Sequence, residues 1–387
     1  MRVAVCISGQ MRTFRRAASS LLANLVEPLD ADIFVHTWNR TGNTNKLILS
    51  LPKGFHLALP REYWHDNPDV LASTSSLFQS ALPNLYGELQ RIADTTSEIT
   101  DGEVSAIYEP VSYSIEEFNG DKFERLLNIS HLKTLVADTT MFNAAPMFYK
   151  IYACDLLRQN YEAAKGFRYD IVIRVRPDLF FGQEVQFDLN IIKGRLFTLH
   201  NPFYEIVNRS DLSNDMLFVG DSHTMTYAAS VWHELPRIWD PAEFLEWPLA
   251  ERGPEKTLHY HLSRRGLEGD VLRIDPAPLR LVNQVGYESM LELVRKDVEE
   301  IGTIPSFLPT CVSICQSIHG VDLYLSGSKE MAARVLAQTV QMNGTRFPEP
   351  FIGRAKIAAL NGDRSSMLSS LASAKKVGQD VAFPELN

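Results

Sequence analysis

The sequence predicts an α/β protein with a Rossmann-like sheet flanked by helices. Two short apolar runs, at 3–7 and 32–38, bracket a segment of helical periodicity, which is the pattern of a βαβ unit. A long amphipathic segment, Ala144–Lys165, leads into a third apolar run at Ile171–Val175. Alternating strands and helices are typical of a parallel or mixed sheet with helices on its faces.

The bulk composition limits the class of protein. The chain has 387 residues, of which 45% are hydrophobic and 22% charged, so it can bury the core of one large domain and a smaller one. Four scattered cysteines are too few for a disulfide framework. A net charge of −9 argues against general nucleic-acid binding, which needs a basic face.

The sequence also bears on location. No apolar stretch approaches the ~20 residues of a membrane span, and the chain opens on a strand pattern rather than on the apolar core of a signal peptide. We therefore expect a cytoplasmic protein without a transmembrane segment, and leave peripheral association with the inner membrane open.

The first βαβ unit sets the start of the sheet. The apolar run at 3–7 predicts a buried strand, a polar loop follows at 8–13, and a helix continues to about residue 27. The second strand is expected at Asp32–Trp38, parallel to the first and joined to it by a right-handed crossover.

The segment 40–140 is rich in turn residues and predicts loops and small helices. We expect one strand in it, at 107–110, and we place the acceptor side of a cleft in this insertion. The expected elements that follow Ile171–Val175 are strands at Leu196–Leu199, 216–220 and 271–274, a helix from a cap at Asp221 or Ser222 to about 234, and a helix from Pro254 to Gly266.

From about residue 286 the strand patterns stop. Helical segments at 333–336, 352–360 and 367–374 predict an α-helical C-terminal region, 286–387, appended to a sheet domain at 1–285. Their spacing resembles one helix–turn–helix unit of a tetratricopeptide repeat, whereas a solenoid needs at least three units. Such an appendage suits the docking of a protein partner.

The loop after the first strand is a candidate anion site. Ser8, Gly9, Gln10 and Arg12 lie between a buried strand and a helix N-terminus, where free N–H groups and the helix dipole favour a phosphate. Gly9 allows close approach of a ligand, and Arg12 can pair with a diphosphate in bidentate fashion. The alternative interpretation is an ordinary tight turn with a solvated arginine.

The strand at Ile171–Val175 ends in an unusual cluster of charge. Arg174 and Arg176 share one side of the strand, and Asp178 follows Pro177 at its exit. Buried arginines need partners, and a diphosphate would serve, while the carboxylate can bind Mg²⁺ or Mn²⁺. A structural Arg–Asp ion pair is the alternative.

Four further residues lie at positions that suit a site. Asp215 precedes a strand and is a candidate acid or base if it faces the cleft. His36 and Trp38 end the second strand at the same predicted edge, where Trp38 can stack on a base or sugar or belong to the core. His261, on the helix predicted from Pro254 to Gly266, is a structural histidine unless it lines the cleft.

In this order, the motifs resemble those of a group of bacterial and large-virus proteins linked to surface polysaccharide synthesis, including capsule and lipopolysaccharide. The motifs are VAVCISGQMRTF, DADIFVHTW, YDIVIRVRPDLFF, NDMLFVGDSHTM and PEKTLHYHLSRRG. The group is regarded as glycosyltransferases of the GT-A type. The resemblance covers residues 1–282 and leaves the C-terminal region outside it.

The resemblance implies roles for the candidate residues. In GT-A enzymes the first loop meets the nucleotide of a sugar donor, and a DxD carboxylate holds a divalent cation, Mn²⁺ or Mg²⁺, on the diphosphate. Asp178 stands alone where DxD is expected, with His261 as a second candidate ligand, so neutralisation by arginine stays open as an alternative. Asp215 would act as the catalytic base, and Arg176 would stabilise the departing diphosphate.

The expected function is transfer of a sugar from a nucleotide diphosphate donor to a saccharide acceptor. One alternative is a sulfotransferase that uses a 5′-phosphosulfate donor (PAPS), because the loop at 10–13 also suits that ligand and such enzymes need no metal. The other is a non-catalytic, degenerate transferase fold whose helical region binds assembly proteins.

Overall fold

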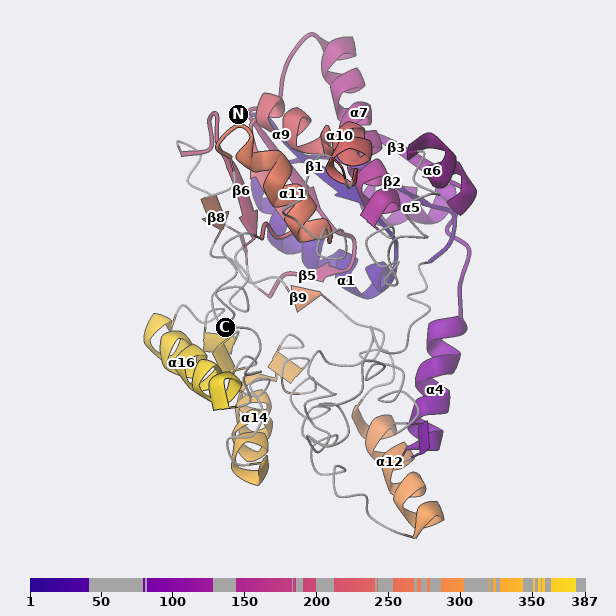
Figure 1. Ribbon diagram of the computed structural model, residues 1–387, viewed down its shortest axis with the longest axis vertical. Coiled ribbons are helices and arrows are strands. Elements are labelled where there is room, and N and C mark those ends of the chain that lie inside the picture. Colours follow the sequence, from indigo (N-terminus) through magenta and orange to yellow (C-terminus); the bar gives the residue numbers. More distant parts are fainter. Residues whose placement is uncertain are drawn as a thin grey trace. The chain divides into compact units, whose positions relative to one another are not determined.

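The architecture is taken from a computed structural model (Figure 1). It describes residues 1–41, 79–80, 82–127, 144–182, 184–185, 191–199, 212–240, 242, 253–267, 270–272, 277–278, 287–302, 320, 323–324, 328–343, 351, 354–355, 357–358 and 363–380. The chain divides into two compact units. They are Met1–Gly42 with Ser97–Pro278, and Asn43–Thr96 with Leu279–Asn387. Part of the predicted insertion thus belongs to the same unit as the C-terminal region, and the boundary at 285 stays a prediction.

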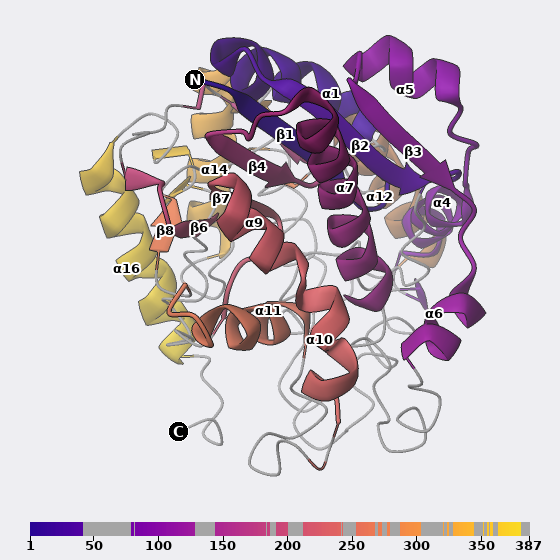
Figure 2. The same cartoon turned by 90° about the horizontal axis from the view of Figure 1, so that it is seen from above.

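The first unit contains a mixed, mainly parallel sheet of seven strands (Figure 2). The strands are β1 Val3–Ser8, β2 Asp32–Trp38, β3 Ser112–Glu116, β4 Ile171–Val175, β6 Leu196–Leu199, β7 Leu217–Gly220 and β8 Asp270–Leu272. Their order is β3-β2-β1-β4-β7-β6-β8, with β7 antiparallel to both of its neighbours. β5 Leu179–Phe180 pairs separately with β9 Ala277–Pro278. The predicted α/β class is confirmed.

Helices cover both faces of this sheet. One core joins Val5 and Ile7 of β1 to α1 Phe14–Leu21 and α5 Asp101–Tyr108. The other joins Ala4 and Cys6 of the same strand to the opposite helix layer. That layer consists of α7 Ala144–Lys165, α9 Ser222–Ala229, α10 Val231–Ile238 and α11 Pro254–Ser263. Alternate residues of a strand face opposite sides, so β1 contributes to two cores.

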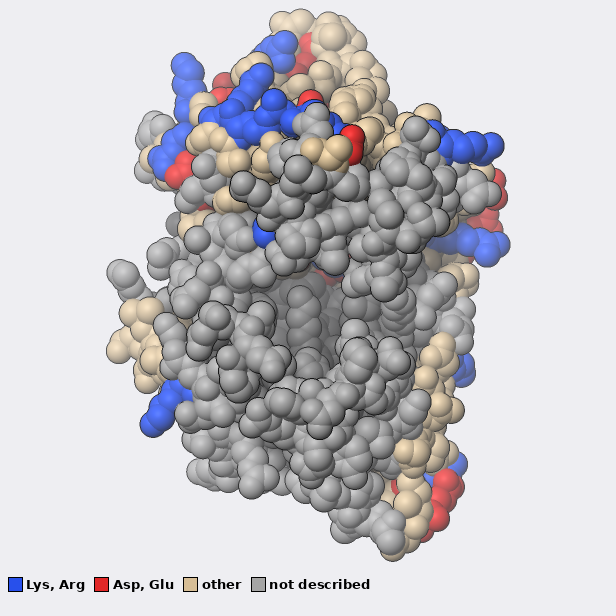
Figure 3. Space-filling model, in the orientation of Figure 1, with Lys and Arg blue, Asp and Glu red and all other residues tan. Residues whose placement is uncertain are grey.

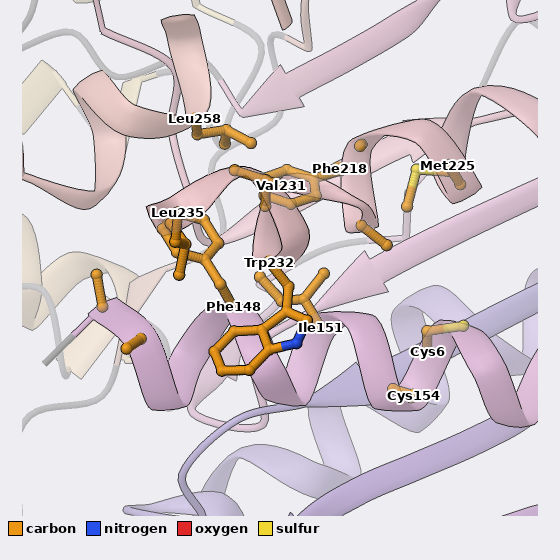
Figure 4. Packing of buried hydrophobic residues seen from close by; sticks show 14 of the residues in the cluster. Cys6, Phe148, Ile151, Cys154, Phe218, Met225, Val231, Trp232, Leu235 and Leu258 are labelled. Atoms are coloured by element: carbon orange, nitrogen blue, oxygen red, sulfur yellow. The ribbon is translucent and has the colours of Figure 1, made fainter. Parts of the chain in front are cut away.

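Large side chains fill the core that joins α7, α9, α10 and α11 to this face of the sheet (Figure 4). Phe148 and Ile151 of α7 are buried, as are Trp232 and Leu235 of α10. Burying each such side chain contributes roughly 1.5–3 kcal/mol, which makes this layer a rigid support for the strands. Cys154 lies in the same core as a buried free thiol.

Two predicted elements differ from the structure, and a local signal explains the first. The strand expected at 107–110 is the end of helix α5, whose cap residue Thr100 accepts a hydrogen bond from the N–H of Glu103. This Thr-x-x-Glu pattern is a helix-start signal that outweighs the β-forming residues Ile107 and Tyr108. The helix expected to continue to 234 is two helices, α9 and α10, which meet at Ser230.

Other predicted ends are confirmed. Asp221 caps α9 by accepting from the N–H of Thr224, and Pro254 occupies the first turn of α11. α1 continues through a π turn at Leu22–Val26 and a 3-10 turn at Glu27–Leu29. α6 Gly120–Leu127 completes the described helices of this unit.

The regular structure described in the second unit is helical. Its longer helices are α4 Pro83–Asp94, α12 Tyr287–Ile301, α14 Lys329–Asn343 and α16 Arg364–Asp380. The buried carboxylate of Asp297 accepts hydrogen bonds from the N–H groups of Asn84 and Leu85, so α12 caps the start of α4. The described residues contain no helix that combines the length and the apolar character of a membrane span.

Candidate functional site

The order of the strands defines where a ligand would bind. From β1 the chain moves to β2 and β3 on one side, then returns through α7 to β4 on the other side of β1. The strand order therefore reverses between β1 and β4, which are parallel neighbours. In open α/β sheets this switch point, at the carboxyl ends of the strands, is the usual ligand crevice. The loop after β1 and the residues after β4 meet there.

Gly9, in the loop after β1, contacts the end of β2 and lies close to the residues that follow β4. Its N–H donates to the carbonyl of His36, and its own carbonyl accepts from Oγ1 of Thr37. A Cβ added at Gly9 would lie 3.9 Å from Cδ of Pro177 and 4.0 Å from Nη2 of Arg174. The φ of +126° is one that L side chains rarely adopt. The loop thus lies directly against the exit of β4.

Arg174 is buried below the site and holds the surrounding segments together through hydrogen bonds. The residue is 1% exposed and donates from Nε to Oγ of Ser8 (3.0 Å) and from Nη2 to the Ser8 carbonyl (3.2 Å). Nη1 donates to the carbonyl of Asp215. Burial lowers the pKa of Arg174 to about 10, and the Asp215 carboxylate opposes that shift. A predicted donor-binding residue therefore connects β1, β4 and the segment before β7.

Arg176 and Asp178 form a bidentate pair. Nε of Arg176 donates to Oδ1 at 2.9 Å and Nη2 to Oδ2 at 2.5 Å. Asp178 is 2% exposed. Burial alone would raise the pKa of its carboxyl, but the charges of Arg176 and Arg12 outweigh burial and hold that pKa below its usual range. Asp178 is thus a carboxylate held ionised by two arginines.

Arg12 completes the cluster and has unused hydrogen-bonding capacity. Its Nη1 lies 3.8 Å from Oδ2 of Asp178, and its side chain is 34% exposed. Its Nε is buried without a partner in the described structure. Desolvation and the charge of Arg176 lower the pKa of Arg12. The partly exposed Arg12 side chain is therefore a group that can pair with a ligand oxygen.

Two further carboxylates, Asp215 and Glu255, affect the pKa values of the arginines electrostatically. Burial tends to lower the pKa of Arg176, but Asp178, Asp215 and Glu255 together raise it. Asp178 and, to a smaller extent, Asp215 also oppose the lowering of the Arg12 pKa by burial and by Arg176. The Asp215 carboxylate is therefore electrostatically coupled to the arginines at the switch point. Gln10 is a partly exposed member of the same loop.

A second polar cluster lies at the ends of β2 and β3. The sequence predicted His36 and Trp38 at this edge, but not Lys150, Tyr149 and Glu116. Lys150 of α7 is buried and donates to the carbonyl of Thr37 (2.8 Å) and to Oε2 of Glu116 (3.0 Å). Burial lowers the pKa of Lys150 to about 8. Tyr149 donates to the other oxygen of Glu116 at 2.9 Å.

His36 and Trp38 belong to this second cluster. Nε2 of His36 lies 3.9 Å from Oε1 of Glu116, and burial with the charge of Lys150 lowers the pKa of His36 to about 3. The ring of Trp38 lies under Nζ of Lys150, 3.4 Å from its centroid, and is 5% exposed. Trp38 is thus a core tryptophan with a cation on its face. A helical lysine 34 residues from its glutamate partner gives no local sequence signal.

His261, the second predicted metal ligand, has partners between α11 and α9. Its ring stacks on Tyr227 at 4.4 Å, and Nε2 lies 2.8 Å from the Tyr227 carbonyl. Burial lowers the pKa of His261. Among the described residues, no three His, Cys, Asp or Glu side chains are grouped so that they could share a metal ion. A lone Asp178 already paired with arginine does not fit a divalent cation.

Positive charge also gathers over the layer of α9 to α11 (Figure 3). There Arg237 and Arg264 both pair with Glu234 at 2.9 Å. Arg265 lies 4.1 Å from the ring centroid of Tyr227. Such pairs at a protein surface contribute little and need no ligand to explain them, so the switch point is the stronger candidate.

No protein-family model matches the chain, and neither a curated protein nor a solved structure does.

Proposed function

We propose that the protein is a glycosyltransferase that moves a sugar from a nucleotide diphosphate donor to a saccharide acceptor. The observation that supports this function best is the convergence of Gly9, Arg12 and the Arg176–Asp178 pair at the switch point of a doubly wound sheet. A close backbone approach beside arginines suits a diphosphate, which carries the negative charge released on sugar transfer.

Each residue has a task in this proposal. Arg12 and Arg176 stabilise the charge that develops on the departing diphosphate. Asp215, coupled to both, accepts the proton of the acceptor hydroxyl as the sugar carbon bonds to that oxygen and its bond to the diphosphate breaks. Arg174 fixes the geometry of Ser8 from behind. The reaction is placed in the cytoplasm and serves surface polysaccharide synthesis, with the helical region available for a protein partner.

A matched pair of variants tests the proposal. Arg12 and Arg15 lie three residues apart, but Arg15 gives its donors to Glu103 and Ser97. We expect Arg12→Gln to weaken nucleotide-sugar binding and turnover roughly 10-fold or more, the worth of a charge-assisted hydrogen bond. Arg15→Gln removes the same charge and should leave both unchanged. The assay is a panel of nucleotide sugars screened by thermal shift and by donor hydrolysis; equal effects of the two variants would refute the assignment.

The arginine pairing of Asp178 favours one second candidate. A sulfotransferase that uses a 5′-phosphosulfate donor needs arginines around its phosphates and no metal. Calorimetry separates the two: a transferase of the proposed kind binds nucleoside diphosphates, and a sulfotransferase binds adenosine 3′,5′-bisphosphate. Tight binding of the bisphosphate with no response to nucleoside diphosphates would replace the first proposal by the second.

A further inference from the structure

We propose that Asp178 is a positioning residue for Arg176 and Arg12, and that the donor diphosphate binds on arginines without a divalent cation. This inference rests on the proposed function, because it concerns the same switch-point site. It departs from the metal-dependent scheme that the resemblance to GT-A enzymes implies.

The first support is how Asp178 is used. Each of its oxygens accepts a hydrogen bond from Arg176, and Arg12 approaches Oδ2 as well. The carboxylate is 2% exposed, so it offers little free surface to an incoming ion. A cation that bound here would have to displace the guanidinium of Arg176 from its only bidentate partner among the described residues. Breaking such a pair without replacing it carries a large penalty.

The second support is the shortage of further ligands. Mg²⁺ and Mn²⁺ prefer several oxygen ligands in octahedral geometry. The described carboxylates and histidines nowhere gather three together, and His261 is engaged with Tyr227. One buried carboxylate with two arginines against it is a poor cation site. The same group is a good anchor for arginines that face an anion.

The third support is the orphaned donor of Arg12. Its Nε is buried and has no partner among the described residues, while its side chain keeps 34% of its surface exposed. Asp178 holds one side of the guanidinium at 3.8 Å and leaves the remaining N–H groups for another acceptor. Phosphate oxygens suit this fork geometry, and a guanidinium fixed before binding loses less entropy. Asp178 therefore acts on the ligand through the arginines.

Isothermal titration calorimetry of the full chain tests this directly. The probes are uridine, guanosine, cytidine and adenosine diphosphates and inorganic pyrophosphate, each titrated in EDTA and again in Mn²⁺. We expect at least one nucleoside diphosphate to bind with a Kd that differs less than about twofold between the two buffers. Binding that requires Mn²⁺ overturns the inference but leaves the proposed function intact. Absence of binding in both buffers overturns the proposed function and the inference with it.

Two variants separate positioning from metal ligation. Asp178→Asn releases Arg176, so we expect a weaker Kd by roughly 10-fold or more, by the same factor in EDTA and in Mn²⁺. A metal ligand would instead lose only the Mn²⁺-dependent part of binding, which contradicts the inference. Arg12→Lys keeps the Arg176–Asp178 pair and the positive charge at position 12, but it removes the planar set of donors that a guanidinium offers to a phosphate. Should Asp178→Asn not fold, a metal-independent loss in Arg12→Lys supports the inference, and unchanged affinity refutes it.

Discussion

Lys150 offers the sharpest test of the electrostatics at the carboxyl edge of the sheet. Its ammonium group is fully buried between Trp38, the Thr37 carbonyl and Glu116. Burial lowers its pKa from 10.5 to about 8, and the interaction with Glu116 only partly opposes that effect. The folded protein therefore loses this proton at a lower pH than the unfolded chain does.

The sign and size of the effect follow from proton linkage. Between pH 8 and pH 10.5 the unfolded chain binds the Lys150 proton and the folded protein does not, so the unfolding free energy rises with pH over this window. Below pH 8 both states are protonated, and the cost of the buried charge is fully present. At about 1.4 kcal/mol per pH unit, the whole window corresponds to roughly 3 kcal/mol.

Lys150→Met removes the titrating group and keeps an apolar stem over Trp38. Between pH 8 and pH 9.5, we expect the unfolding free energy of the wild type to rise by roughly 2 kcal/mol relative to that of this variant. Urea unfolding at several pH values, followed by tryptophan fluorescence, measures the difference. Titration of Cys154, whose pKa burial raises, is common to both proteins and cancels in the comparison.

The matched control is Lys165→Met, at the exposed C-terminal end of the same helix α7. The unfolding free energy of this variant should change with pH in the same way as that of the wild type. The reasoning fails if the pH profile of Lys150→Met is parallel to that of the wild type, because Lys150 would then titrate alike in the folded and unfolded chains.

Two further substitutions test the support of the site. Arg158→Met leaves Asp155 and Glu162 buried without the guanidinium that pairs with both, and should cost about 3–5 kcal/mol of unfolding free energy in urea titrations; a loss below about 1 kcal/mol would contradict a buried ion network. Gly9→Ala places a side chain at φ +126°, which should lower the unfolding free energy by about 1–3 kcal/mol and also weaken donor binding. The control is Gly166→Ala, at φ +70° with open space around it, which should lower stability without affecting donor binding. Unchanged nucleotide affinity in Gly9→Ala would remove that loop from the site.

Much of the site could be predicted because it lies at the ends of strands. Period-2 alternation assigns Arg174 and Arg176 to one side of β4, and the βαβ pattern makes β1 and β4 ends fall on one edge. The sequence could not predict that Arg174 is enclosed and donates to Ser8 and Asp215, since that depends on how β1, β4 and the segment before β7 come together. Nor could it predict the pairing of Lys150 with Glu116, which requires α7 to cross β2 and β3 at one particular height.

The three arginines at the switch point have different physical settings, which assign them different tasks in the proposed anion site. Arg174 is enclosed and gives its donors to neutral oxygens of Ser8 and Asp215, so its charge is a fixed positive field that no ligand can touch. Arg176 donates from Nε and Nη2 to the two oxygens of Asp178, and this bidentate pair fixes the orientation of its guanidinium. Arg12 alone combines exposure with an unpaired donor. Substitutions should therefore cost folding most at Arg174 and anion affinity most at Arg12, and an acid added beside Asp178 would weaken the site, since it would compete with the anion for the same guanidinium groups.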